Sequence, residues 1–227
     1  MCSLLDGISL YMRYIKQSPC QRHAPCMIYG QGGISIMIRK YGNLVRLKDL
    51  DDDFFIDLRY STPDNFTGEV VYDFRECYVD ESTAHRLIQA KDLLKRRGFG
   101  LKIWDAYRPV SAQRQFWNLC PDNNFVARPP DMSTIQEFKN SHMNGQCVDV
   151  TLTDPDGRNA VMPSEFDDFS PRARLDCPET HGEARRNAEL LRDVMVQCGF
   201  SPYDGEWWHF YDHTVEPAPY SDYAFDE

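Results

Sequence analysis

Residues 141–152 read SHMNGQCVDVTL, a stretch that joins a turn to a strand. Apolar side chains alternate with polar ones in its second half, at Val148, Val150 and Leu152. This alternation predicts a half-buried β-strand with Asp149 on the face opposite the apolar packing. Residues seven apart point to opposite faces of a straight strand, so His142 and Asp149 can converge only if the chain bends between them. Gly145 can supply that bend.

Further elements are predicted on both sides of this strand. Asp80 and Ser82 can cap a helix that ends at Gly98. The following residues, GLKIWDAY, predict a strand, and a helix of about residues 182–198 ends before Gly199. Helices and strands come in mixed order without a repeating βαβ unit. We therefore expect an α+β fold with a central, mainly antiparallel sheet flanked by helices.

The sequence pattern divides the chain into two parts. Residues 1–45 show no clear periodicity and are predicted to be an N-terminal appendage. Residues 46–227 contain no linker long enough to separate two cores, so they are predicted to form one domain. The appendage carries CQRHAPC at residues 20–26, which offers three zinc ligands where a closed structural site takes four. A loosely packed leader without metal is the alternative that we favour.

The acidic balance of the chain argues against nucleic-acid binding. Its 25 lysines and arginines against 35 acidic residues give a net charge of −10, without a long basic run to grip phosphates. No stretch approaches the about 20 apolar residues of a membrane span. Charged residues interrupt the apolar start before a signal peptide develops, at Asp6, Arg13 and Lys16. We therefore expect a cytoplasmic protein without a membrane partner, with mostly reduced cysteines.

Two segments, SHMNGQCVDV and GEWWHF, carry the residues of a metal-dependent hydrolase. Two imidazoles and one carboxylate are a common ligand set for a catalytic zinc ion, which keeps a further position for water. His142, Asp149 and His209 supply this set for one zinc ion per chain. Glu206 is then a spare carboxylate that can act as general base and general acid.

The zinc hypothesis sets a geometric condition on both segments. Glu206 and His209 are three apart, so in a straight strand they too would point to opposite faces. We expect a strand end, a bulge or a helical turn between them, and a bend at Gly145. Taken alone, His142 and Asp149 are more typical of polar residues on a surface, and Glu206 and His209 are more typical of the edge of a core. The other histidines are assigned no function: His23, His85, His181 and His213.

Arg108 is the candidate cation of the site. Pro109 follows it and biases its backbone away from the helical region, so the arginine is presented from extended or turning chain before a helix of about residues 111–119. A fixed guanidinium can stabilise a developing oxyanion. The alternative for Arg108 is a structural ion pair with Asp105.

Four ordered motifs identify a resemblance: FIDLRYSTPDNFTG (55–68), GLKIWDAYRP (100–109), SHMNGQCVDVTL (141–152) and EWWH (206–209). Together they resemble the zinc D-alanyl-D-alanine dipeptidases of the vancomycin-resistance type, over about residues 46–225. That family is related to DD-peptidases and hedgehog-like domains. The resemblance implies an α+β fold with a central antiparallel sheet.

Carried over position by position, the resemblance implies the same three zinc ligands, with Glu206 as general base and acid and Arg108 as transition-state stabiliser. It also implies residues near the substrate, namely Tyr60, Asn140, Ser141 and Asp167. Asp167 is the candidate partner for the free ammonium group of the substrate. Asn140 stands where the family often has serine, and its amide can donate to a substrate carboxylate. Cys147 replaces a usual alanine, either as a packing residue, which we favour, or as an extra zinc ligand.

The leading functional hypothesis is a zinc metallopeptidase that hydrolyses the dipeptide D-Ala-D-Ala to free D-alanine. One alternative is a murein peptidase that acts on longer cell-wall peptides with the same metal chemistry. The other is a zinc-stabilised, hedgehog-like binding module without turnover. The expected partner is a small D,D-dipeptide, and the sequence leaves the formation of a homo-oligomer open.

Overall fold

The computed structural model describes residues 26–29, 35–122 and 126–225, with side chains from Ile38 onward. The leader motif at residues 20–26 lies outside the side chains described, so both interpretations of it stay predictions. The described chain begins with an antiparallel hairpin of β1 (Cys26–Tyr29) and β2 (Ser35–Ile38). No helix in the described ranges has the length and apolar character needed to cross a membrane.

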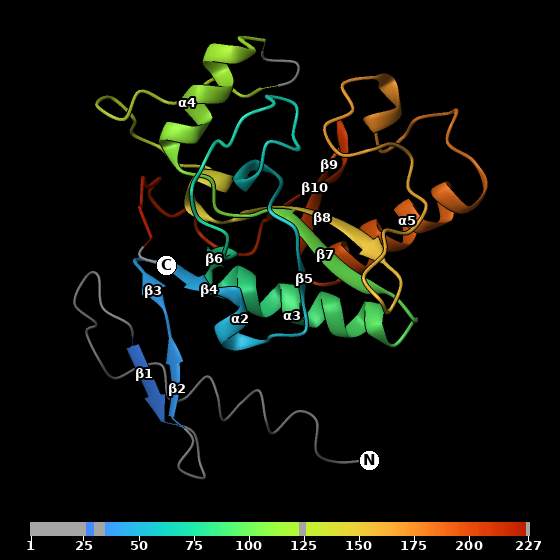
Figure 1. The fold of residues 1–227 in the computed structure, drawn as a ribbon, viewed down its shortest axis with the longest axis horizontal. Coiled ribbons are helices and arrows are strands. Elements are labelled where there is room, and N and C mark those ends of the chain that lie inside the picture. The colour runs from blue at the N-terminus through green and yellow to red at the C-terminus, as the bar shows by residue number, and fades with distance from the viewer. Residues whose placement is uncertain (1–25, 30–34, 123–125, 226–227) are drawn as a thin grey trace.

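A five-stranded sheet forms the centre of the fold (Figure 1), in the order β5-β7-β8-β10-β9. Its strands are β5 (Phe55–Ile56), β7 (Gly100–Asp105), β8 (Cys147–Thr153), β9 (Phe200–Tyr203) and β10 (Glu206–Asp212). The pair β5–β7 is parallel, and the other neighbouring pairs are antiparallel. The predicted α+β fold with a mainly antiparallel sheet is confirmed.

The three predicted helices, α3, α4 and α5, are present, and α2 is a short helix that was not predicted. They are α2 (Leu47–Leu50), α3 (Glu81–Lys95), α4 (Val110–Leu119) and α5 (Gly182–Gln197), with short 3₁₀ turns η1 (Arg59–Ser61), η2 (His142–Asn144) and η3 (Pro171–Ala173). The side chain of Asp80 accepts the amide of Ser82 at the start of α3, as expected of an N-cap. Gly98 and Gly199 have positive φ after α3 and α5, which ends each helix.

The main apolar core lies between the sheet and the pair α3 and α5, which contact each other. Figure 1 shows α3 running beneath the sheet and α4 away from both helices. The prediction that β8 is half-buried is wrong, because all of its residues are buried. Loops cover the second face: Phe166, after β8, packs on Trp104 and Trp208. The alternation of apolar and polar residues within a strand cannot reveal such a cover, because residues outside the strand provide it.

A smaller sheet joins strands on both sides of the boundary predicted at residue 45. It contains β3 (Lys40–Tyr41), β4 (Leu44–Arg46) and β6 (Tyr78–Asp80), in the order β3-β4-β6. Leu44 and Val45 are fully buried. The division into appendage and domain stays a prediction. The strands of the smaller sheet begin at Lys40, before the predicted boundary.

Candidate active site

The predicted bend between His142 and Asp149 is present. His142 begins the 3₁₀ turn η2, which the Ser141 side chain caps by accepting the amide of Met143. Gly145 ends the turn in the left-handed region with a φ of 71°. A side chain there would have no room, because an added Cβ would lie 2.8 Å from the backbone nitrogen of Asp80. The turn therefore folds His142 back toward the face of β8 that carries Asp149.

The irregularity predicted between Glu206 and His209 is also present. Both residues belong to β10, but the register of β10 against β9 shifts between Glu206 and Phe210. Pro202, the partner of Phe210, has no N–H to donate, which an edge strand such as β9 tolerates. The shift lets Glu206 and His209 line the same pocket although they are three residues apart.

The three predicted ligands converge on one point. His142 Nε2 lies 3.2 Å from His209 Nδ1 and 3.4 Å from an oxygen of Asp149. His209 Nδ1 lies 2.9 Å from the other oxygen of Asp149. Ligands held tetrahedrally at about 2.0–2.2 Å from zinc are themselves about 3.3–3.6 Å apart. The donor set and its spacing therefore fit a zinc ion.

Contacts around the ligands prepare them for a cation. His142 Nδ1 lies 2.7 Å from the carbonyl oxygen of Ala106, which can only accept, so Nδ1 donates there and Nε2 is the ring nitrogen that faces the other ligands. Burial by itself would raise the pKa of Asp149, but the charge and hydrogen bonds of His142 and His209 outweigh it and hold this pKa well below its usual range. Asp149 is therefore an anion within the group.

Arg108 fits both interpretations given to it from the sequence. It lies beside the metal ligands, as expected of a cation that stabilises an oxyanion, and it forms the ion pair with Asp105. Its Nε and Nη2 lie 2.8 and 2.6 Å from one carboxylate oxygen of Asp105. Its Nη1 donates to Gln113 at 3.0 Å, and Nη2 lies 3.7 Å from Asp149. The ion pair fixes the guanidinium, and the guanidinium still faces the metal ligands.

Glu206 lies beside the ligand group without joining it. One carboxylate oxygen is 4.0 Å from His209 Nδ1, and the side chain keeps 28% of its surface exposed. Burial in the pocket raises the pKa of Glu206 to about 7, with the charge of His209 opposing this rise and the charges of Asp149 and Asp167 adding to it. A carboxyl group with such a pKa can both take and return a proton near neutral pH.

Tyr60 and Asp167 meet at another wall of the pocket. The Tyr60 hydroxyl donates to one oxygen of Asp167 at 2.9 Å. The other oxygen, Oδ2, is buried and has no hydrogen-bond partner among the described residues. Burial raises the pKa of Asp167 to about 7, although the Tyr60 bond lowers it. Asp167 also has a φ of 58°, a left-handed conformation that is uncommon outside glycine, and it lines the pocket.

Asn140, Ser141 and Cys147 line the same pocket and differ in how far their side chains are already engaged in other contacts. The amide of Asn140 donates to the backbone carbonyls of Asp212 and Val215, so its predicted donation to a substrate carboxylate would require these bonds to break. The Ser141 hydroxyl accepts at the cap of η2 and still has its proton to donate. Burial raises the pKa of Cys147 well above its usual value, which favours a packing role for this thiol.

All nine predicted site residues line one pocket of about 380 Å³. Tyr203 belongs to the same lining and is absent from the sequence prediction. It pairs with Glu206 across the two-residue turn between β9 and β10, and its ring meets the ring of His209 edge-on at 5.9 Å. The turn residues Asp204 and Gly205 could have revealed this neighbour, because paired residues share a face of the sheet.

An α+β fold that gathers two histidines, an aspartate and a spare glutamate in one pocket defines a zinc hydrolase of the peptidase type. Residues 40–226 match the family described as D-ala-D-ala dipeptidase, and the chain belongs to this family. The family predicted from the four motifs is thus confirmed, as is the enzyme class.

Relatives with established names agree with this assignment. The D-alanyl-D-alanine dipeptidase of Escherichia coli (strain K12) is 33% identical over 167 residues, which cover 74% of this chain and 83% of the relative. The D-alanyl-D-alanine dipeptidase of Enterococcus faecium is 32% identical, with 75% and 90% covered. Among solved structures, a vancomycin-resistance D,D-pentapeptidase in complex with Zn(II) shows 14% identity and a TM-score of 0.37, with 60% and 72% covered.

Proposed function

We propose that the protein is a zinc-dependent dipeptidase that hydrolyses D-Ala-D-Ala to two molecules of D-alanine. The observation that carries the proposal is the convergence of His142, Asp149 and His209 beside an uncoordinated Glu206. The names of its relatives supply the substrate, since both are D-alanyl-D-alanine dipeptidases.

His142, Asp149 and His209 would hold the metal ion. A zinc ion in such a site supplies a Lewis acid and lowers the pKa of water to about 7. Glu206 takes a proton from the attacking water and delivers it to the nitrogen of the peptide bond that breaks, so that the leaving D-alanine departs as a neutral amine. Its pKa of about 7 suits both halves of this transfer.

Arg108 stabilises the negative charge that develops on the oxygen of the attacked carbonyl. Its guanidinium is held by Asp105 and Gln113 before substrate arrives, so little reorganisation is needed during the reaction. The rings of Tyr60 and Phe116 lie 5.1 and 4.8 Å from its central carbon and limit its movement further.

Asp167 binds the free ammonium group of the substrate. Its unpartnered Oδ2 is the acceptor that an ammonium group can satisfy, and that new charge would return the carboxyl group to its ionised form. Tyr60 holds the other oxygen in place. A peptide with a blocked amino group cannot make this contact, and a buried acceptor left unpaired discriminates strongly against it.

The names of both relatives favour a dipeptide substrate over the longer peptides of the murein-peptidase alternative. Membership of the dipeptidase family argues against the alternative of a binding module without turnover. The cytoplasmic location, the homo-oligomer and the lack of nucleic-acid or membrane partners stay predictions from the sequence.

The test is to incubate zinc-loaded protein with D-Ala-D-Ala, L-Ala-L-Ala, N-acetyl-D-Ala-D-Ala and D-Ala-D-Ala-D-Ala, and to measure released alanine. Release of D-alanine from the free D,D-dipeptide, with far slower release from the other three, supports the proposal. No release of alanine from any of the four would contradict the proposed substrate. Equal rates on the acetylated peptide or the tripeptide would instead indicate a peptidase for longer chains.

A further inference from the structure

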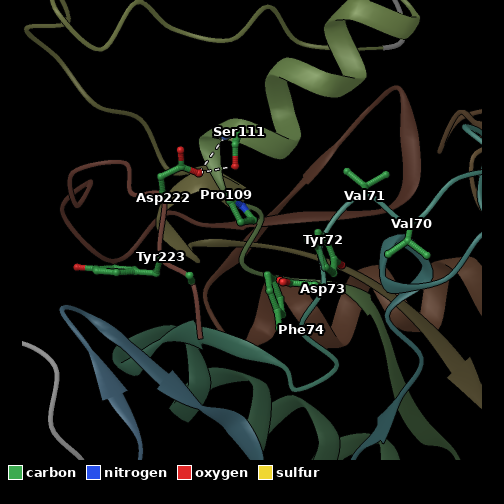
Figure 2. Close-up of a pocket in the computed structure, with 10 residues that line it drawn as sticks. Val70, Val71, Tyr72, Asp73, Phe74, Pro109, Ser111, Asp222 and Tyr223 are labelled. Atoms are coloured by element: carbon green, nitrogen blue, oxygen red, sulfur yellow. Dashed lines mark hydrogen bonds between the residues drawn. The ribbon is translucent and has the colours of Figure 1, made fainter. Parts of the chain in front are cut away.

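A second cavity, of about 490 Å³, lies outside the substrate pocket (Figure 2). Residues 70–74 form one wall, and Pro109, Ser111 and residues 222–224 form the rest. Tyr72 belongs to this lining and not to that of the substrate pocket. Figure 2 shows Tyr72 next to Phe74, and their rings are stacked 4.3 Å apart. Tyr72 is therefore a residue beyond the reach of substrate.

The Tyr72 hydroxyl is nevertheless linked to Arg108 through one carboxylate. It donates to Oδ1 of Asp105 at 3.0 Å, while Arg108 occupies Oδ2 of the same group. Asp105 is fully buried, so water does not compete for either oxygen. Because both oxygens are held from different sides, the carboxylate cannot turn about its axis without breaking one bond.

The two donors to Asp105, Tyr72 and Arg108, both keep their protons. Burial, with the charge of Asp105 adding to it, raises the pKa of Tyr72 well above its usual value, so the hydroxyl stays a neutral donor. Asp105 and the other nearby negative charges keep Arg108 cationic against the effect of burial, and its pKa is raised. Tyr72 therefore takes part in this chain of bonds as a neutral donor, and Arg108 takes part as a cation.

We propose that Tyr72 is a positioning residue that fixes the Arg108 guanidinium by holding the carboxylate of Asp105. Without the hydroxyl, Oδ1 has no other hydrogen bond among the described residues, and the carboxylate can rotate to seek one. The guanidinium would move with it, and small displacements of a catalytic group lower a rate steeply. The inference rests on the proposed role of Arg108 in D-Ala-D-Ala hydrolysis.

Tyr72→Phe isolates the hydroxyl, because the ring keeps its stack on Phe74. Tyr107→Phe is the matched control: Tyr107 is also buried, and its hydroxyl accepts the amide of Tyr223 at 2.8 Å instead of contacting Asp105. Tyr72→Phe removes the hydrogen bond to a buried carboxylate oxygen, and Tyr107→Phe removes the acceptor of the Tyr223 amide and of the Ser221 hydroxyl, so both substitutions should lower thermal stability.

The kinetic test is a double-mutant cycle with zinc-loaded protein and D-Ala-D-Ala. We expect Tyr72→Phe to lower kcat about 10-fold with KM changed less than about 2-fold, and Tyr107→Phe to leave both within about 2-fold. In an Arg108→Ala background, Tyr72→Phe should have no further effect. The proposal is overturned if Tyr72→Phe keeps the kcat of the wild type, or if it lowers kcat by the same factor when Arg108 is absent.

A second readout does not depend on turnover. In ¹H–¹⁵N spectra, the Arg108 Nε–H should be protected from exchange in the wild type, and should shift and exchange faster in Tyr72→Phe but not in Tyr107→Phe. An unchanged Arg108 signal in Tyr72→Phe contradicts the proposal. If the wild type fails to hydrolyse D-Ala-D-Ala, the proposed function fails, and this spectrum still decides whether Tyr72 positions Arg108.

Discussion

His209 lies directly opposite Asp149 in the antiparallel ladder between β10 and β8, and their side chains meet at 2.9 Å. Strand pairing thus sets the distance between two of the three metal ligands. A slip of one residue would turn one of them to the other face of the sheet. The third ligand, His142, is placed by the turn that ends at Gly145.

Gly145→Ala tests the turn. The left-handed backbone and the contact with Asp80 should together make this variant less stable by about 2–5 kcal/mol and weaken zinc binding. Gly68→Ala is the control, because Gly68 has nearly the same φ of 70° but its added Cβ would meet no described atom within 4 Å. It should lose only about 1–2 kcal/mol. Urea unfolding and zinc content measure both, and equal losses would contradict the steric explanation.

His209→Ala tests the ligand set. Loss of one of three protein ligands should lower zinc affinity more than about 100-fold. Mutation of residues that only contact the ligands already lowers metal affinity by about 10–100-fold. His213→Ala should bind zinc as the wild type does, because His213 is exposed and contacts Ser201. A zinc competition titration measures the difference. Equal affinities in the two variants would remove His209 from the site.

Removal of the metal should also destabilise the fold. A ligand present at about 1,000 times its Kd stabilises the native state by about 4 kcal/mol. We expect a chelator to lower the Tm of the wild type and to leave the Tm of His209→Ala nearly unchanged. Differential scanning calorimetry with and without zinc checks this, and a chelator effect of the same size in both proteins would place the metal elsewhere.

Glu206→Gln separates metal binding from catalysis. The amide keeps the size of the side chain but cannot take a proton, so kcat should fall about 10²–10⁴-fold while one zinc ion remains bound. Zinc content by elemental analysis and alanine release measure the two properties side by side. Turnover at the wild-type rate would overturn the assignment of Glu206 as the base.

Asp167→Asn should alter stability in a pH-dependent way. The pKa of Asp167 is about 7 in the folded chain and about 3.9 when unfolded, so wild-type stability is lost as the pH rises between these values. Asparagine stays neutral and tolerates the φ of 58°. The zinc-free variant should therefore gain on the order of 1–3 kcal/mol over the wild type at pH 8 and nothing near pH 4.

Urea unfolding at the two pH values measures this gain, and a difference that does not change with pH would contradict the buried charge. The same variant should raise KM for D-Ala-D-Ala about 10-fold or more, because the ammonium group loses its counter-charge. Greater stability with poorer binding is the expected combination at a site built for a ligand.

Local signals explain why much of the fold and site could be predicted from the sequence. The Asp80 cap and the glycines after α3 and α5 are properties of a few adjacent residues. The bend at Gly145 follows from the need to bring His142 toward Asp149. The spacing of Glu206 and His209 likewise required the irregularity that β10 shows.

Other features depend on parts of the chain that meet only in three dimensions. The bonds that engage the Asn140 amide come from residues 212–215, and the hydroxyl that holds Asp105 comes from Tyr72, in a loop before β6. Neither pairing leaves a periodic or capping signal. The cover over the second face of β8 was invisible for the same reason.

The most direct test of the zinc site is a crystal structure of the protein with zinc, with the ion located by its anomalous scattering. We predict one peak within about 2.0–2.2 Å of His142 Nε2, a carboxylate oxygen of Asp149 and a ring nitrogen of His209, with Glu206 outside this shell. A peak coordinated by Glu206 or Cys147, or no peak among the three ligands, would contradict the account.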